Sequence, residues 1–125
     1  MIELDTHVVA WLHAGELKQI PRKVRARLDE EELLICPVVL LELEYLREIG
    51  RLTVTADRIF ADLAAEIGLR IADGSFPGVI QESLRQNWTP DPFDRIIAAH
   101  AIVTGHALAS KDKQLRRHCP VAFWG

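Results

Sequence analysis

Short apolar runs alternate along this chain with longer segments in which apolar residues recur every three or four positions. The short runs predict strands, which are expected at MIELD, near residues 33–36, and at LRIAD, HALAS and VAFW. The longer segments predict helices, which are expected over residues 7–14, 21–32, 38–50, 55–67, 77–86, 91–105 and 112–118. This alternation is typical of βα units, so it predicts one α/β domain of residues 1–125 with a central, mainly parallel sheet flanked by helices.

Two aspartates follow predicted strands. Asp5 ends the first strand, and Asp112 comes just after the fourth. Ligands of open parallel sheets bind outside the carboxyl ends of the strands, so both acids are well placed for function. Each acid also has a local explanation, because Asp5 or Thr6 can cap the first helix and Asp112 can cap the last.

A third acid lies on the apolar side of a predicted helix. On a helical wheel of residues 38–51, Glu42 falls in the middle of the apolar side. An ionised carboxylate left alone there would cost several kcal/mol, so Glu42 needs a partner. A salt bridge or a hydrogen bond with a neighbouring helix end would satisfy it without any function. Glu44 differs, because it lies on the polar side with Arg47 as a possible partner.

The stretch TPDPFDRIIAAH, residues 89–100, contains two aspartates around a Pro-Phe pair. With Asp91 as N-cap, the proline takes the favoured first helical position and Asp94 the third, which resembles a capping box. Capping accounts for Asp91 fully and for Asp94 only partly. The small residues Ala98 and Ala101 share the face of Asp94 and leave space above it.

Strand ends and helix starts can meet at one edge of an alternating α/β sheet, which would bring four acids together. They are Asp5, Glu42, Asp94 and Asp112. Carboxylates within a few ångströms of one another raise one another's pKa values. Hard divalent cations relieve that repulsion, and Mg²⁺ or Mn²⁺ fits best. One or two such ions can activate water and stabilise the leaving oxygen of a phosphodiester, and this chemistry needs no histidine base.

Composition narrows the class of protein. The 125 residues are 49% hydrophobic and 26% charged, as in soluble domains, and the net charge is −3. This acidic balance argues against nucleic-acid binding by bulk charge alone but permits a local basic rim. Cys36 and Cys119 have no metal-binding spacing, so we expect reduced thiols in a cytoplasmic protein. No apolar stretch approaches the ~18 residues of a membrane span.

Four segments resemble, in order and spacing, the motifs of PIN-domain ribonucleases, and most closely those of the VapC-type toxins of toxin–antitoxin pairs. The segments are LDTHVVAWL, CPVVLLELEYL, DPFDRIIAAHAI and ALASKDKQL. The resemblance extends from residue 1 to about residue 123. It implies a compact, three-layer PIN-like fold and Mg²⁺- or Mn²⁺-dependent endonuclease cleavage of RNA.

The resemblance also implies roles for individual residues. The metal-binding acids of the family fall on Asp5, Glu42, Asp94 and Asp112. Thr6 and Ser110 match hydroxyl residues that would orient ligands or water. The chain departs from the family at Val39, often serine, at Leu41, often tryptophan, and in the run 87–90 before DPFD. Because the acids are intact, these departures concern substrate handling rather than catalysis.

RNA held near an acidic site requires cations around it. The candidates are Arg95, beside Asp94, and Lys111 and Lys113, which flank Asp112. A second basic cluster consists of Arg22, Lys23, Arg25 and Arg27. The alternative for each of these residues is a solvated surface charge.

The resemblance further implies an antitoxin partner and a homodimer. Apolar contact surface could come from Trp11, Leu12 and the helix 55–67, unless these are simply core. We expect His7 to pack or cap and His100 to lie in the core.

Two other functions fit the pattern less well. A receiver-type signalling domain also gathers acids at strand ends and carries a late lysine, here Lys111. It requires adjacent acids after the first strand, where Asp5 stands alone. A catalytically silent PIN fold that binds RNA or a partner is the other alternative, and the intact acids argue against it.

Overall fold

Five short strands form one sheet in the computed structural model, which describes residues 1–125. The strands are β1 (Ile2–Leu4), β2 (Leu33–Ile35), β3 (Arg70–Ile71), β4 (Ala107–Ala109) and β5 (Ala122–Phe123). Their order in the sheet is β3-β2-β1-β4-β5, and every neighbouring pair is parallel. The predicted, mainly parallel sheet is therefore confirmed.

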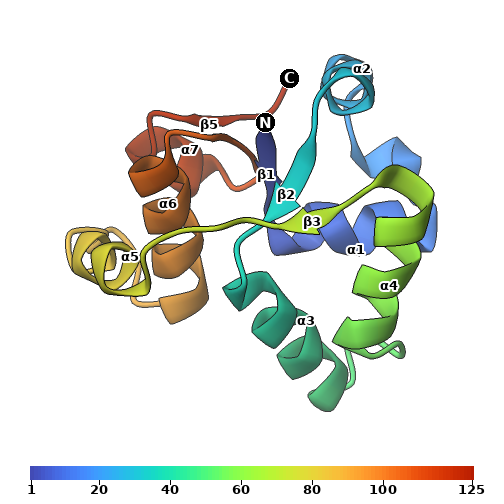
Figure 1. The fold of residues 1–125 in the computed structure, drawn as a ribbon, viewed down its shortest axis with the longest axis horizontal. Helices are drawn as coiled ribbons and strands as arrows, with labels where there is room; N and C mark the ends of the chain where they lie inside the picture. Colours follow the sequence, from blue (N-terminus) through green and yellow to red (C-terminus); the bar gives the residue numbers. More distant parts are fainter.

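Helices cover both sides of this sheet. They are α1 (Thr6–Ala14), η1 (Leu17–Gln19, a 3₁₀ turn), α2 (Arg22–Glu30), α3 (Val38–Glu48), α4 (Ala56–Ile67), α5 (Phe76–Ser83), α6 (Pro92–Thr104) and α7 (Lys113–His118). Figure 1 shows α5, α6 and α7 on one side of the sheet and α1, α2 and α4 on the other, while α3 packs against both α4 and α6. The sheet is thus the middle of three layers, and only η1 was not predicted.

Local sequence determines where the first helix begins and ends. Of its two predicted caps, Asp5 is the one used, since its Oδ1 accepts a hydrogen bond from the Thr6 amide at 2.8 Å. The Thr6 hydroxyl instead donates to Glu42. The helix stops at Gly15, whose φ of 74° is readily adopted by glycine. The turn between β1 and α1 therefore places the polar side chains of Asp5 and Thr6 next to each other at the end of β1.

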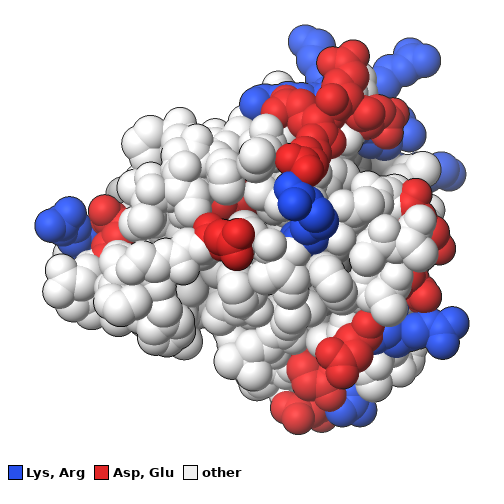
Figure 2. Space-filling model, in the orientation of Figure 1, with Lys and Arg blue, Asp and Glu red and all other residues white.

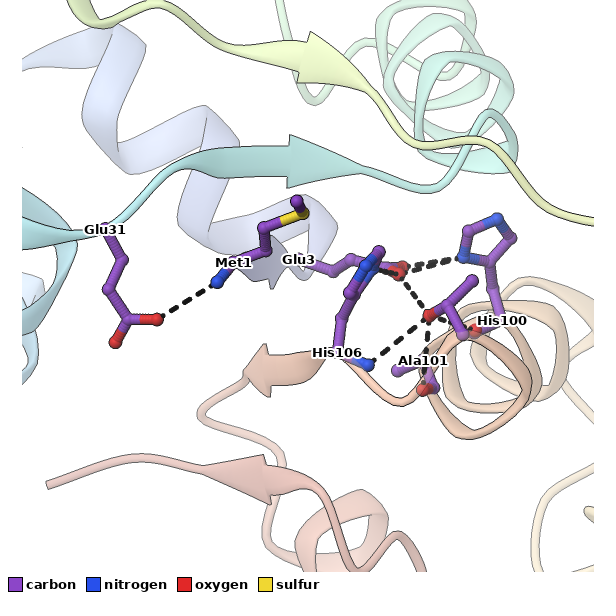
Figure 3. A network of polar contacts seen from close by, with 7 residues as sticks. Met1, Glu3, Glu31, His100, Ala101 and His106 are labelled. Atoms are coloured by element: carbon purple, nitrogen blue, oxygen red, sulfur yellow. Dashed lines mark hydrogen bonds and ion pairs between the residues drawn. The ribbon is translucent and has the colours of Figure 1, made fainter.

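A buried acid in the central strand ties β1 to α6. Glu3 is 1% exposed, and its carboxylate lies 2.8 Å from His100 Nδ1, 2.8 Å from His106 Nδ1 and 2.9 Å from the Thr104 hydroxyl (Figure 3). Burial alone raises the pKa of Glu3, but the hydrogen bonds with His100, His106 and Thr104 and the charge of His100 outweigh it, so this pKa lies below its ordinary value. His100 is in the core as predicted, whereas its acidic partner was not predicted.

Exposed apolar side chains are spread over several elements, but three of them follow one another along α3. Leu41 and Tyr45 of α3 and Ile49, its C-cap, follow at four-residue spacing and are 61%, 45% and 49% exposed. Trp11 and Leu12, the contact candidates on α1, instead pack against the core and are partly buried. Helix α4 packs against α1 and α3. The more exposed apolar stripe therefore belongs to α3.

The cysteines are structural. Cys36 and Cys119 are buried and unpaired, and burial raises the pKa of the Cys36 thiol to about 12. Buried, protonated thiols of this kind are inert. A separate finding is that none of the helices has the length and apolar character needed to cross a membrane.

Candidate functional site

A cavity of about 350 Å³ lies where β1 and β4 end, beside the starts of α1 and α6 and the flank of α3. It is lined by Asp5, His7, Trp11, Glu42, Asp91, Asp94, Lys111 and Asp112. Five of these eight residues are acids, so we call this space the carboxylate cavity. It contains all four acids that the sequence singled out.

Parallel pairing of two strands explains why the strand-end acids meet. Leu4 of β1 pairs with Ala109 of β4, and the Asp5 amide donates a hydrogen bond to the Ala109 carbonyl at 3.0 Å. Asp5 and Asp112 therefore follow adjacent strands at the same edge of the sheet. Asp112 also caps α7, because its Oδ1 accepts hydrogen bonds from two amides of that helix at 2.9 and 3.0 Å.

Asp5 is fixed by two hydrogen bonds at the floor of the cavity. It is 7% exposed, its Oδ1 accepts from the Thr6 amide, and its Oδ2 accepts from the Ser110 hydroxyl at 2.6 Å. Burial raises the pKa of Asp5, although the hydrogen bonds from Ser110 and Thr6 oppose the rise. Ser110 thus orients a carboxylate that the fold keeps away from water.

Glu42 has a hydroxyl partner rather than a cation. The Thr6 hydroxyl, at the first residue of α1, donates to Glu42 Oε1 at 2.5 Å, and no salt bridge reaches this side chain. The hydrogen bond with a neighbouring helix end, which the sequence offered as an explanation without function, is therefore present. Burial, and then the charges of Asp5 and Asp91, raise the pKa of Glu42 above its ordinary value. The predicted Glu44 and Arg47 pair forms on the polar side of the same helix. The two glutamates therefore differ as their places on the helix predicted.

Asp94 carries no hydrogen bond on its carboxylate. The capping box suggested by the sequence does not form, because the Asp91 amide donates to the Thr89 hydroxyl at 3.2 Å and not to Asp94. Burial, and then the neighbouring charges of Asp91, Asp5 and Glu42, raise the pKa of Asp94 to about 7. Helix capping thus leaves the position of Asp94 unexplained.

Asp91 belongs to the cavity as well as to the helix start. Its Oδ1 accepts from the Phe93 amide at 2.8 Å and from the Asp94 amide at 3.4 Å, which confirms it as the N-cap of α6. It also lines the carboxylate cavity, which the sequence interpretation missed. The sequence did contain a signal for this placement of Asp91. An N-cap residue lies within one helical turn of the third helical residue, which here is Asp94.

The positively charged candidates divide by position. Lys111 lines the cavity, with its Nζ 5.6 Å from the centre of the Trp11 ring. Arg95 does not line it, because its Nε donates to the Thr89 carbonyl at 2.7 Å, and Lys113 is exposed outside it. His7, expected to pack or cap, lies 6.0 Å from Trp11 between ring centres, and it is also exposed and lines the cavity.

The donor set suits a hard cation, although its side chains are not yet gathered around one point. Carboxylate oxygens are the ligands that Mg²⁺ prefers. As the side chains stand, no group of three or more acids, histidines or cysteines could hold a metal ion. The side chain of Asp94 is free of hydrogen bonds, so it can rotate inward without breaking one, whereas Asp91 and Asp112 each offer a free second oxygen while the first caps a helix.

Comparison with known proteins places the chain in a family. A family model described as PIN domain matches residues 2–119. The chain is also 30% identical, over 128 aligned positions, to Ribonuclease VapC22 from Mycobacterium tuberculosis (strain ATCC 25618 / H37Rv), and the match covers 97% of this chain and 96% of that protein.

Solved structures share the fold at lower sequence identity. The crystal structure of VapBC2 from Rickettsia felis, bound to a DNA fragment from the promoter, matches with a TM-score of 0.64 and 20% identity, over 100% of both chains. A toxin–antitoxin complex from Klebsiella pneumoniae matches with a TM-score of 0.65 and 18% identity, over 98% of this chain and 96% of that one. These likenesses concern the fold, and together with the family match they lead to one conclusion. The chain belongs to the PIN domain family.

Proposed function

We propose that this protein is a Mg²⁺- or Mn²⁺-dependent endoribonuclease and the toxin of a type II toxin–antitoxin pair. The observation that carries the proposal is the convergence of five carboxylates on one cavity, with no salt bridge to any of them. Acids in this arrangement raise one another's pKa values, and a hard cation relieves the repulsion.

The acids that would hold the ion are Asp5, Glu42 and Asp94, with Asp112 completing or tuning the site. Held by these residues, such an ion would supply Lewis-acid chemistry, which lowers the pKa of water and withdraws charge from a scissile phosphate. The Ser110 and Thr6 hydroxyls fix the orientation of Asp5 and Glu42, so these two proposed ligands are held in place while Asp94 would move towards them.

Lys111 is the cation that we assign to the substrate, because it alone of the three candidates lines the cavity. Its ammonium group would attract the RNA phosphate towards an otherwise acidic space. Arg95 and Lys113 would contact RNA only outside the cavity.

Known relatives support the toxin assignment. The 30%-identical relative is a ribonuclease by name, and the structural neighbours described above are a DNA-bound VapBC2 and a toxin–antitoxin complex by title. We therefore propose a cognate antitoxin as partner. We also propose a homodimer, for which the stripe of Leu41, Tyr45 and Ile49 offers exposed apolar surface.

A cleavage assay tests this function. The wild-type protein should cut a fluorescent single-stranded RNA in Mg²⁺ or Mn²⁺ and lose all cleavage in EDTA. Asp94→Asn should cut the RNA more than about 100-fold more slowly. This loss is larger than the ~10–100-fold loss that is usual when a residue merely hydrogen-bonded to a metal ligand is mutated. Asp57→Asn, at an exposed aspartate of α4, is the matched control and should cut normally. RNA binding without metal-dependent cleavage would instead indicate the catalytically silent module.

A further inference from the structure

A second concave surface lies beside the carboxylate cavity, between α2 and the C-terminus. It encloses about 440 Å³, and we call it the basic groove. Its charged lining residues are Lys23 and Arg27 of α2 and Arg116 of α7, and no acid lines it. Figure 2 shows Lys and Arg side chains projecting from the molecule where α2 lies, with Asp and Glu side chains between them. In a chain of net charge −3, this groove is a local concentration of positive charge.

Two of the three cations of the basic groove are free of ion pairs. Lys23 is exposed and forms no salt bridge, and Arg116 forms none either, although its Nε is buried and has no hydrogen-bond partner. Arg27 pairs with Glu31 at 2.8 Å, while its guanidinium lies 4.1 Å above the centre of the Phe123 ring. The groove thus offers cations held beside an aromatic ring.

Two contacts join the basic groove to the carboxylate cavity. Trp124, in the groove, lies 6.0 Å from Trp11, in the cavity, measured between ring centres. The guanidinium of Arg116 donates to the carbonyl of Lys111, which also lines the cavity, at 3.3 Å. The two hollows are therefore neighbours, with tryptophan rings and cations along the boundary.

Cations interleaved with aromatic rings are the means by which proteins hold single-stranded nucleic acid. The cations follow the phosphates, and bases stack on the rings without regard to sequence. We infer that the basic groove binds the RNA strand on one side of the scissile phosphate, with its phosphates against Lys23, Arg27 and Arg116 and bases on Trp11 and Trp124. This inference rests on the proposed ribonuclease function, and it assigns RNA binding to the basic cluster of α2.

The test compares Lys23→Gln/Arg27→Gln with the wild type on a 20-nucleotide single-stranded RNA in Mg²⁺. We expect KM to rise by about 3–10-fold at moderate salt, and the slope of log KM against log salt to fall by about 1.4, which is ~0.7 for each lost phosphate contact. The value of kcat should stay within about twofold, because neither side chain reaches the carboxylate cavity. Arg51→Gln/Arg85→Gln, at exposed arginines outside both hollows, is the charge-matched control.

Further measurements separate this inference from its alternatives. Lys23→Gln, at a side chain without a salt bridge, repeats the test without placing a new charge beside Arg27 or disturbing its packing on Phe123. An unchanged KM and salt slope in both variants would overturn the inference. If the same variants also lost binding to poly-glutamate, which is measured as a mimic of an acidic peptide, the groove would instead be assigned to an acidic protein segment. If the wild type cleaves no RNA, the proposed function fails. The fluorescence anisotropy of the labelled RNA then tests RNA binding by the groove directly. Equal RNA affinity of the wild type and the variants would overturn the inference. Weaker and less salt-dependent RNA binding by the variants would support it.

Discussion

Asp91 caps the helix that carries Asp94 and, at the same time, raises the pKa of Asp94. One oxygen of Asp91 accepts hydrogen bonds from the Phe93 and Asp94 amides, at 2.8 and 3.4 Å. After burial, the charge of Asp91 is the largest cause of the raised pKa of Asp94, which is about 7. The start of α6 therefore stabilises the helix while concentrating negative charge in the carboxylate cavity.

Separating these two effects of Asp91 gives the first prediction. Asp91→Ser keeps a capping oxygen and removes the charge, whereas Asp91→Ala removes both. We expect Asp91→Ala to lower the free energy of unfolding by about 1 kcal/mol and Asp91→Ser to lower it by less than ~0.5 kcal/mol. In metal-free protein, both variants should lower the pKa of Asp94, which carbonyl ¹³C chemical shifts can follow. Equal stability of the two variants, or an unchanged pKa, would contradict the double role.

The raised pKa of Asp94 predicts how stability depends on pH without metal. The folded protein holds the Asp94 proton more tightly than the unfolded chain, in which Asp94 has its ordinary pKa of 3.8. Protonation of Asp94 therefore contributes fully to the free energy of unfolding below pH ~4, and this contribution is lost as pH rises through about 7. Asp94→Asn removes the titration. At pH 8 the Asp94→Asn variant should be more stable than the wild type by only on the order of 1–2 kcal/mol, because solvent screens part of the repulsion. This gain in stability should vanish near pH ~4.

Urea unfolding in EDTA at pH 4, 6 and 8 measures this difference. Added Mn²⁺ should reverse it at pH 8, because the ion stabilises the wild type through its ionised carboxylates. A gain from Asp94→Asn that is equal at all three pH values would show that the repulsion assigned to Asp94 is absent.

The hydroxyls that orient the acids make the third prediction. Thr6→Val and Ser110→Ala leave Glu42 and Asp5 without their side-chain donors. Losing such partners of metal ligands typically lowers metal affinity or activity by about 10–100-fold. Thr6→Ser keeps the hydroxyl and should recover most of the activity. If Thr6→Val and Thr6→Ser cleave RNA equally fast, the hydroxyl has no orienting role.

The fourth prediction concerns the buried pairing of Glu3 with His100 and His106. Glu3→Gln leaves the two imidazoles facing a neutral amide, so we expect a loss of about 2–4 kcal/mol in the free energy of unfolding at pH 7. Since the pKa of Glu3 is lowered in the folded state, the contribution of its charge is present above the ordinary value of 4.5 and is lost as pH falls below it.

Denaturant titration measures the effect of Glu3→Gln. The control is Glu31→Gln, at an acid whose partners are the N-terminus and Arg27, and it should change stability by less than ~1 kcal/mol. Comparable losses in the two variants would mean that the buried network adds no more than a surface pair.

The sequence predicted the architecture well because strand and helix periodicities are local properties. The order of elements identifies a parallel sheet, and a parallel sheet sends strand-end acids to one edge. Glu42 was recognisable because its helix is otherwise apolar on that side, and burial of its side chain is confirmed. Its hydroxyl partner Thr6 was matched to the family, but the contact between the two was not predicted, because it joins α1 to α3.

The misses share a cause, which is that they depend on packing between distant segments. Glu3 reads as a polar residue between Ile2 and Leu4, and only the placement of α6 over β1 makes it buried. Asp91 has a sufficient local explanation as a cap, which hides its place in the cavity. The basic groove unites α2 with the C-terminus, and no local pattern reveals that meeting.

Divalent-cation binding in the carboxylate cavity is the property on which the proposed function depends. Its most direct test is Mn²⁺ binding to the purified protein at pH 8, followed by electron paramagnetic resonance, with Asp94→Asn as the variant and Asp57→Asn as the charge-matched control. We predict that the wild type and Asp57→Asn bind Mn²⁺ equally and that Asp94→Asn weakens binding by at least about 10-fold, since it removes a proposed ligand. Equal binding by all three proteins would contradict the claim.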